Sequence, residues 1–197
     1  AGDFVVASLA PSFPISFPGA PGALGEALRR LGFAYVEETA VAAQLVALEH
    51  RRLSAETDRP LITSSCPSLL SLVSKYYPEA MEHIAPIVSP MIAHGRMLRQ
   101  VHSDRAIRVV FIGPCVAKKG EVADPLVAGA VDVALSFLEL EEWLAAEGLA
   151  VTETAAPQPA PVAQTARLFP VEGGLFRTAD LPTDLVDPNY LVISGFD

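Results

Sequence analysis

The chain has only two cysteines, Cys66 and Cys115, and each follows a short apolar run typical of a β-strand. Cys66 precedes Pro67, which suits the first position of a helix, and apolar side chains then recur at helical spacing. We therefore expect Cys66 to cap a helix, where unpaired backbone N–H groups and the helix dipole favour a thiolate. Lys118 and Lys119 follow Cys115 within one turn and favour its thiolate in the same way.

Two thiols at the carboxyl ends of strands indicate a ligand site, because open α/β sheets bind ligands at that edge. Other roles stay open at this point. Free cysteines are often buried as small hydrophobic side chains. A disulfide is less favoured, because nothing in the sequence indicates an oxidising compartment. Two thiolates do not complete a tetrahedral metal site, so iron or zinc would need two further ligands.

The composition predicts a folded, acidic protein. The 197 residues are 51% apolar with a mean hydropathy of +0.36, enough for one domain or two small lobes. The 23 acidic against 14 basic residues give a net charge of -9, which argues against a nucleic-acid partner. No run approaches the roughly 18 apolar residues of a membrane span, and no basic signal-peptide region begins the chain, so we expect a cytoplasmic protein.

The elements that must position the two thiols are predicted by periodicity and turn residues. Strands are expected at 4–9, 33–36, 61–63, 107–112, 131–135 and 190–193, and helices at 22–31, 39–53, 67–77, 91–101 and 137–147. Ser136 with Glu139 forms a capping box for the last helix. Residues 11–19 and the proline-rich stretch 152–166 are expected to be loops. The alternation of strands and helices predicts an α/β fold with mainly parallel sheets flanked by helices.

The two cysteine segments lie in a longer series of motifs that resembles a known family, the iron-only ([FeFe]) hydrogenase large subunit, C-terminal (H-cluster) domain. The residues that carry the resemblance are Thr63-Ser64-Ser65-Cys66-Pro67, Lys75-Tyr76-Tyr77-Pro78-Glu79, Ser89-Pro90, Pro114-Cys115-Val116-Ala117-Lys118-Lys119 with Glu121, Gly173-Gly174 before Arg177-Thr178, and Ser194-Gly195. These motifs follow one another in order over most of the chain. The likeness therefore implies a two-lobed hydrogenase-like fold, with lobes at about 1–103 and 104–197.

In that family the H-cluster joins a 4Fe-4S cubane to a two-iron centre carrying CO and cyanide. The resemblance implies that Cys66 and Cys115 are cubane ligands, and that Lys118 hydrogen-bonds a cyanide of the two-iron site. It also places Pro114 and the pair Gly173-Gly174 at the cofactor. For the glycines an ordinary turn is the simpler alternative.

The departures from the family concern proton transfer. Active members have a proton-relay cysteine before the first ligand, and this chain has Ser65, whose hydroxyl is far less acidic than a thiol. Other family positions on the proton path or beside the cluster hold Ala85, His50, Leu53, Gly113 and Met91-Ile92. We therefore expect rapid proton delivery to be lost. The four histidines, His50, His83, His94 and His102, have no zinc-site spacing with the cysteines and are expected to have packing or surface roles.

The family's third cysteine motif would follow Ser194-Gly195, so we expect it beyond residue 197 of a longer protein. With two of four ligands, the isolated chain is expected to be inactive and to lack a complete cluster. The expected partners are electron-transfer or signalling domains of the same longer protein.

Three functions remain after these observations. The favoured one is redox or hydrogen sensing with little turnover, because the ligands are kept while the relay is lost. The second is a true but slow hydrogenase. The third is an iron–sulfur carrier or assembly protein without the two-iron centre.

Overall fold

The computed structural model describes residues 3–19, 22–63, 65–151, 164–183 and 189–192. Two compact units form, each from two stretches of chain: Ala1–Thr39 with Met91–Pro161, and Ala40–Pro90 with Val162–Asp197. The lobe boundary expected near residue 103 falls inside the first unit. The reason is that strands from both sides of this boundary pair in a single sheet.

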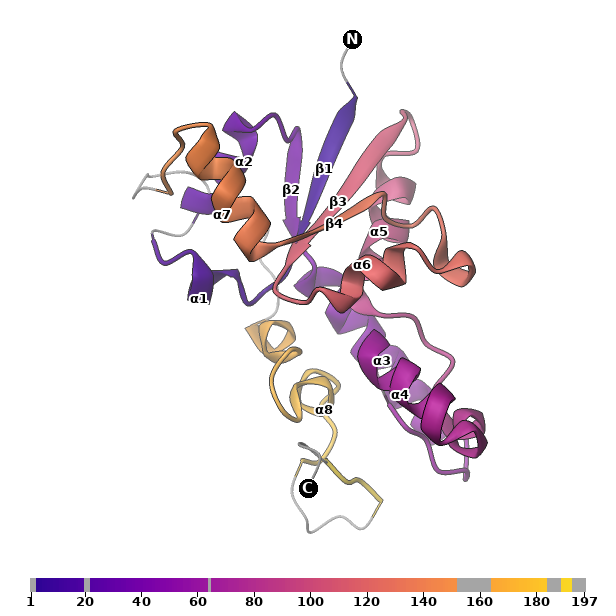
Figure 1. Ribbon diagram of the computed structural model, residues 1–197. Helices are drawn as coiled ribbons and strands as arrows, with labels where there is room; N and C mark the ends of the chain where they lie inside the picture. The colour runs from indigo at the N-terminus through magenta and orange to yellow at the C-terminus, as the bar shows by residue number, and fades with distance from the viewer. Residues whose placement is uncertain (1–2, 20–21, 64, 152–163, 184–188, 193–197) are drawn as a thin grey trace. The chain divides into compact units, whose positions relative to one another are not determined.

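The first unit is built on a four-stranded parallel sheet of β1 (Phe4–Leu9), β2 (Tyr35–Glu38), β3 (Ile107–Gly113) and β4 (Val133–Ser136). The strand order is β2-β1-β3-β4 (Figure 1). Central strands β1 and β3 are apolar on both faces, as buried parallel strands are, and Val6 pairs with Val109 where both are fully buried. The predicted α/β fold with a parallel sheet is confirmed, although β2 and β4 begin two residues later than expected.

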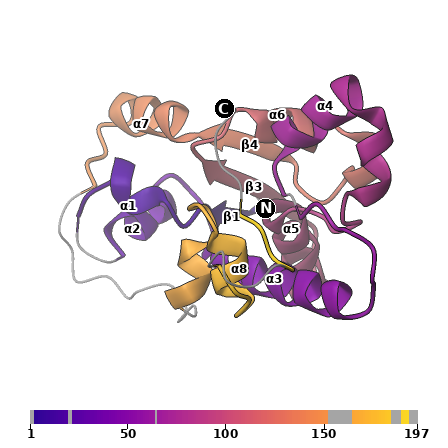
Figure 2. The same cartoon turned by 90° about the horizontal axis from the view of Figure 1, so that it is seen from below.

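Helices cover both faces of this sheet. Helices α2 (Ala23–Arg30) and α7 (Phe137–Ala146) lie on one face and α5 (Pro90–Val101) on the other (Figures 1 and 2). The unit also contains α1 (Phe13–Ser16), α6 (Ala117–Val122) and the 3-10 turn η2 (Pro125–Val127). Helix α7 starts with the predicted capping box, in which Ser136 and Glu139 exchange hydrogen bonds. Helix α1 lies in a stretch that was expected to be a loop.

Helix α5 packs on the sheet through Gly95 and Arg99. A Cβ at Gly95 would lie 2.4 Å from the Ala130 carbonyl oxygen, so only glycine permits this approach. Arg99 donates hydrogen bonds to the carbonyls of Ala130 and Ile107 at 3.1 and 3.2 Å, and to Asp132. The orientation of α5 is therefore set by both backbone contact and charge.

The second unit contains α3 (Ala40–Ala55), α4 (Pro67–Tyr76), α8 (Gly174–Thr178) and the 3-10 turns η1 (Pro78–His83) and η3 (Gln164–Leu168). Within its described residues this unit has no strand, only an isolated parallel bridge between Ile62 and Ile84. The predicted strand at 61–63 is therefore wrong, because no neighbouring strand continues the pairing. Residues 190–192 of the strand expected at 190–193 form no strand either, and residue 193 lies outside the described residues.

Two further expectations are only partly covered by the structure. Residues 152–163 of the expected proline-rich loop, and the closing Ser194-Gly195, lie outside the described residues. The last part of that loop, from Gln164, begins η3.

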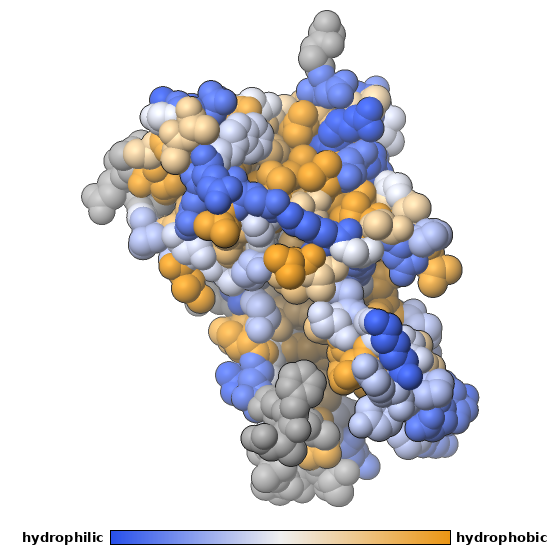
Figure 3. Space-filling model, in the orientation of Figure 1, coloured by the Kyte–Doolittle hydropathy of each residue, from blue (hydrophilic) through white to orange (hydrophobic). Residues whose placement is uncertain are grey.

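The surface mixes polar and apolar side chains, which are interspersed on the face seen in Figure 3. In the first unit Ile15, Val116, Leu126 and Leu138 are large apolar residues that are mostly exposed. Among the described residues, no helix has the length and apolar character needed to cross a bilayer.

Candidate cofactor site

Cys66 stands at the N-cap of α4 with extended backbone angles, and Pro67 takes the first helical position. The Cys66 carbonyl accepts the first helical hydrogen bond from the Leu70 N–H at 3.1 Å. The predicted cap position is therefore confirmed. Cys66 is exposed, so the alternative of a buried hydrophobic cysteine does not hold in this unit.

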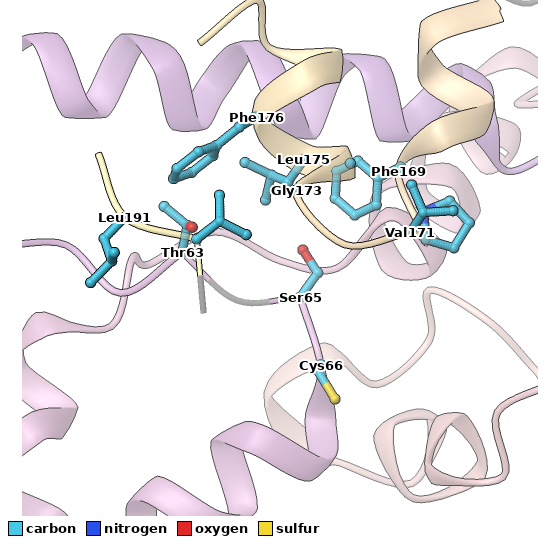
Figure 4. A pocket seen from close by; sticks show the side chains of 12 residues that line it. Thr63, Ser65, Cys66, Phe169, Val171, Gly173, Leu175, Phe176 and Leu191 are labelled. Carbon is cyan, nitrogen blue, oxygen red and sulfur yellow. The ribbon is translucent and has the colours of Figure 1, made fainter. Parts of the chain in front are cut away.

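A cavity of about 450 Å³ lies beside Cys66 within the second unit. Most residues that line it have apolar side chains, although polar and apolar atoms share its surface about equally. They come from the segment before α4, from the stretch that includes the start of α8, and from the chain near residue 191: Thr63, Ser65, Cys66, Phe169, Pro170, Val171, Gly173, Gly174, Leu175, Phe176, Leu191 and Val192. In Figure 4 the Ser65 hydroxyl points toward the Gly173 segment, whereas the Cys66 sulfur points away from it. The Ser65 hydroxyl therefore faces the cavity, whereas the adjacent Cys66 thiol does not face the Gly173 segment.

The glycine pair is needed for the packing of α8 on η3. Gly173 has a positive φ of 65°, which favours glycine, and a Cβ at Gly174 would lie 1.8 Å from the Leu168 carbonyl oxygen. Thr178 Oγ1 lies 2.7 Å from the Gly174 carbonyl oxygen and 2.9 Å from that of Thr165, which holds the two segments together. Both glycines line the cavity, but the left-handed backbone at Gly173 and the close packing at Gly174 already explain why they are glycines.

Cys115 lies in the first unit, just beyond the carboxyl end of β3, and is exposed. Gly113 ends that strand, and a Cβ there would lie 2.7 Å from the Phe111 ring. Pro114 and Cys115 follow, and the Cys115 carbonyl accepts a hydrogen bond from the Lys118 N–H at 3.2 Å. The predicted strand–turn–cysteine arrangement is confirmed at this position.

The two lysines near Cys115 bind carboxylates. The ammonium of Lys118 lies 2.6 Å from Glu121 Oε2, and both side chains are largely buried. Lys119 binds Glu139 of the α7 capping box, and together with the Ser136 hydrogen bonds this lowers the pKa of Glu139 to about 2. Lys119 therefore binds the capping box at the start of α7. Lys118 is the lysine with a fixed position beside the Pro114-Cys115 turn.

The structure thus divides the predicted site residues between the units. Ser65, Cys66, Gly173 and Gly174 line one cavity of the second unit, whereas Pro114, Cys115 and Lys118 follow β3 in the first. Sequence reasoning missed the apolar lining of the cavity. Phe169 and Phe176, which flank the glycine pair, were the signal that could have indicated it.

The donors present suit an iron–sulfur cluster in type but not in number. Thiolates are the usual ligands of such clusters, and a cubane takes four of them. The sequence has two cysteines, and among the described residues no three His, Cys, Asp or Glu side chains gather to hold one ion. A cubane held by four thiolates would therefore need two of them from outside the 197 residues.

The sequence matches the family described as iron only hydrogenase large subunit, C-terminal domain, over residues 3–186. The chain belongs to this family. Within this iron-only hydrogenase family, the NADP-reducing hydrogenase subunit HndD of Solidesulfovibrio fructosivorans is 30% identical over 121 residues, which cover 53% of this chain and 21% of that subunit.

Solved hydrogenase structures share the fold. The structure of HydA(deltaEFG), described as revealing stepwise [FeFe]-hydrogenase H-cluster assembly, matches with a TM-score of 0.66 and 26% identity. A glutamate-to-glutamine variant of [FeFe]-hydrogenase HydA1 from Chlamydomonas reinhardtii matches with a TM-score of 0.63 and 27% identity. Each match covers 80% of this chain and 45% of the solved chain, so this chain spans less than half of these relatives.

Proposed function

We propose that this hydrogenase-family domain supplies Cys66 and Cys115 as two thiolate ligands of a 4Fe-4S or H-cluster-type centre, and that it senses redox state or hydrogen with little turnover. Both thiols are exposed at the end of a regular element, where a metal can reach them. The remaining ligands would come from outside these residues, together with the electron-transfer or signalling domains that use the centre. When bound, such a centre supplies one-electron chemistry.

Ser65 is the observation on which the sensing role rests. It lines the cavity beside Cys66 at the position where the resemblance predicts a proton-relay thiol. A serine hydroxyl rarely ionises near neutral pH, so it transfers protons poorly compared with a thiol. A sensor needs the binding site but not fast proton delivery, and the retained ligands with the lost relay match that requirement.

The residues themselves would have two further roles in this proposal. Lys118, already paired with Glu121, would offer an N–H donor to an anionic ligand on the side of Cys115. The apolar side chains of the cavity, including Phe169 and Phe176, would limit water around the Ser65 hydroxyl.

Metal binding is tested first, on the full natural protein reconstituted anaerobically with ferrous iron and sulfide. We expect iron and the visible absorption of an iron–sulfur cluster, and a loss of both in Cys66→Ala and in Cys115→Ala. Lys75→Ala, a substitution on α4 away from the cavity lining, is the control and should bind iron normally. Iron binding that is unchanged in both cysteine variants would refute the ligand assignment.

The sensing role is tested separately by Ser65→Cys in the full protein isolated with its natural cluster, because reconstitution with iron and sulfide supplies no CO or cyanide. We expect hydrogen turnover to rise strongly over a low starting value, with Ser65→Ala as the control that stays low. High turnover in the unchanged protein would favour a true hydrogenase. Infrared bands of CO and cyanide are expected, and a cluster without them would favour an iron–sulfur carrier instead.

A further inference from the structure

A chain of buried polar side chains lies between α5 and the sheet of the first unit. Ser8 on β1 and His94 on α5 are fully buried, and Thr39 after β2 is 4% exposed. Ser8 Oγ lies 2.9 Å from Thr39 Oγ1 and 2.7 Å from His94 Nδ1, and His94 Nε2 lies 3.0 Å from Glu37 Oε2. We call Thr39, Ser8, His94 and Glu37 the polar clasp. Burying a polar group between a helix and a sheet costs free energy unless the group is hydrogen-bonded, and each member of the polar clasp has a hydrogen-bond partner.

With a neutral His94 imidazole, the chemistry of the groups sets one direction for these hydrogen bonds. A hydrogen bond from His94 outweighs the effect of burial and holds the pKa of Glu37 below its usual value, so this carboxylate only accepts. His94 must then carry a proton on Nε2. If the imidazole is neutral, its Nδ1 accepts from the Ser8 hydroxyl, and the Ser8 oxygen is left to accept from Thr39. Tyr35 also donates to Glu37, at 3.2 Å, so all donors lead to this one anion.

The order serine, histidine, carboxylate is also that of a nucleophilic triad, but this arrangement is unsuited to that role. Ser8 has no exposed surface, so no substrate can reach its oxygen. The polar clasp therefore has a structural role.

The clasp lies where the chain passes out of the first unit and returns to it. The chain leaves after Thr39 and re-enters at Met91, and His94 is the fifth residue of α5. Through Ser8, the clasp therefore joins the last residue before residues 40–90 to the N-terminal part of the helix that follows them. The Thr39 N–H also bonds the Leu9 carbonyl at 2.8 Å, which fixes Thr39 to the end of β1.

We propose that the polar clasp is a positioning device that keeps together the two ends of the 40–90 segment, the segment that carries Cys66. A buried hydrogen-bond chain with one direction accepts one geometry, whereas apolar contacts tolerate small shifts of a helix. Without the clasp, α5 would still pack through Gly95 and Arg99, but His94 would lose its hydrogen-bonded link to Thr39 through Ser8. This inference concerns the chain alone and does not depend on the proposed cofactor.

The test is hydrogen exchange on the whole chain with Thr39→Val and Ser8→Ala. Each substitution removes one hydroxyl and keeps or reduces the side-chain volume. We expect amides at 36–42 and 91–96 to exchange about tenfold faster relative to those of β3, because a buried partner is left unsatisfied. The matched control is Leu98→Ala, a buried apolar site on α5, which should speed exchange across the unit without changing that ratio.

Coupling gives a second criterion. In the double variant Ser8→Ala, Thr39→Val, the increase should be smaller than the product of the two single increases, because both substitutions break the same chain. Multiplicative effects, or a ratio unchanged in both single variants, would overturn the proposal.

The unchanged protein tests the clasp even if the variants do not fold. The Thr39 amide should exchange as slowly as those of β3, and nitrogen NMR should find the proton of the neutral His94 ring on Nε2. Fast exchange at Thr39, or a proton on Nδ1 alone, would each contradict the arrangement.

Discussion

Replacing Gly174 by alanine should be the most damaging small change in the second unit. The added Cβ would meet only backbone atoms: the Leu168 carbonyl oxygen at 1.8 Å, the Leu168 carbonyl carbon at 2.7 Å and the Phe169 carbonyl carbon at 2.9 Å. Backbone cannot rotate aside as a side chain can, so α8 must move away from η3. That movement also stretches the contact of Thr178 with the Thr165 carbonyl.

The expected magnitude follows from comparison with two other glycines. Overpacking usually costs about 1–3 kcal/mol, and with backbone on the opposing side we expect about 3 kcal/mol for Gly174→Ala. Gly173→Ala adds no contact closer than 3.7 Å and should cost only the left-handed strain, roughly 1–2 kcal/mol. Gly25→Ala, inside α2 with nothing within 4 Å, should stabilise by about 0.5–1 kcal/mol.

The measurement is urea denaturation followed by circular dichroism, with midpoints compared at equal m-value. Because the chain has two units, exchange of the α8 amides is followed in parallel to locate the effect. A loss smaller for Gly174→Ala than for Gly173→Ala would show that α8 does not pack on the Leu168 carbonyl. Destabilisation by Gly25→Ala would show that there is no free space for a methyl group beside Gly25.

Three further predictions concern the first unit. Ser136→Ala should cost about 1 kcal/mol by urea denaturation because it removes the side-chain cap of α7, while Ser136→Thr should cost little. The lowered pKa of Glu139, about 2, means that its contribution is present above the unfolded value and is lost as pH falls toward 2; Glu139→Gln should therefore remove part of the acid sensitivity of the melting temperature. Partial burial alone would raise the pKa of Asp132, but the Val109 N–H and the Arg99 and Arg108 guanidiniums hold it below its usual value. Asp132→Asn should thus cost about 2 kcal/mol in thermal melts near neutral pH and little near pH 2, and an equal loss at both would contradict the ionic origin.

Local rules explain what could be predicted from the sequence. Ser136 and Glu139 are three residues apart, and Cys66 directly precedes Pro67, so capping chemistry within one turn determines both helix starts. The central strands are apolar enough to be recognised without their partners. The family, too, could be recognised in advance, because its motifs are short and keep their order along the chain.

The predictions that differ from the structure concern segments whose fold depends on pairing with a distant strand. Residues 61–63 and 190–192 have strand-like composition, but a strand also needs a neighbour, and in the described residues Ile62 has only its bridge to Ile84. The boundary expected near residue 103 differs from the observed units because β1 pairs with β3 across the intervening 40–90 segment.

The sequence by itself determined where helices begin, which runs become central strands, and which two thiols are available. Only the tertiary structure decided that Ser8, an unremarked residue inside an apolar strand, bonds His94 from a helix 86 positions away. The tertiary structure likewise decided that Gly174 must be a glycine, because a carbonyl of another segment occupies the space of its side chain. Contacts of this kind depend on where distant segments meet after folding, and no local pattern of residues records that.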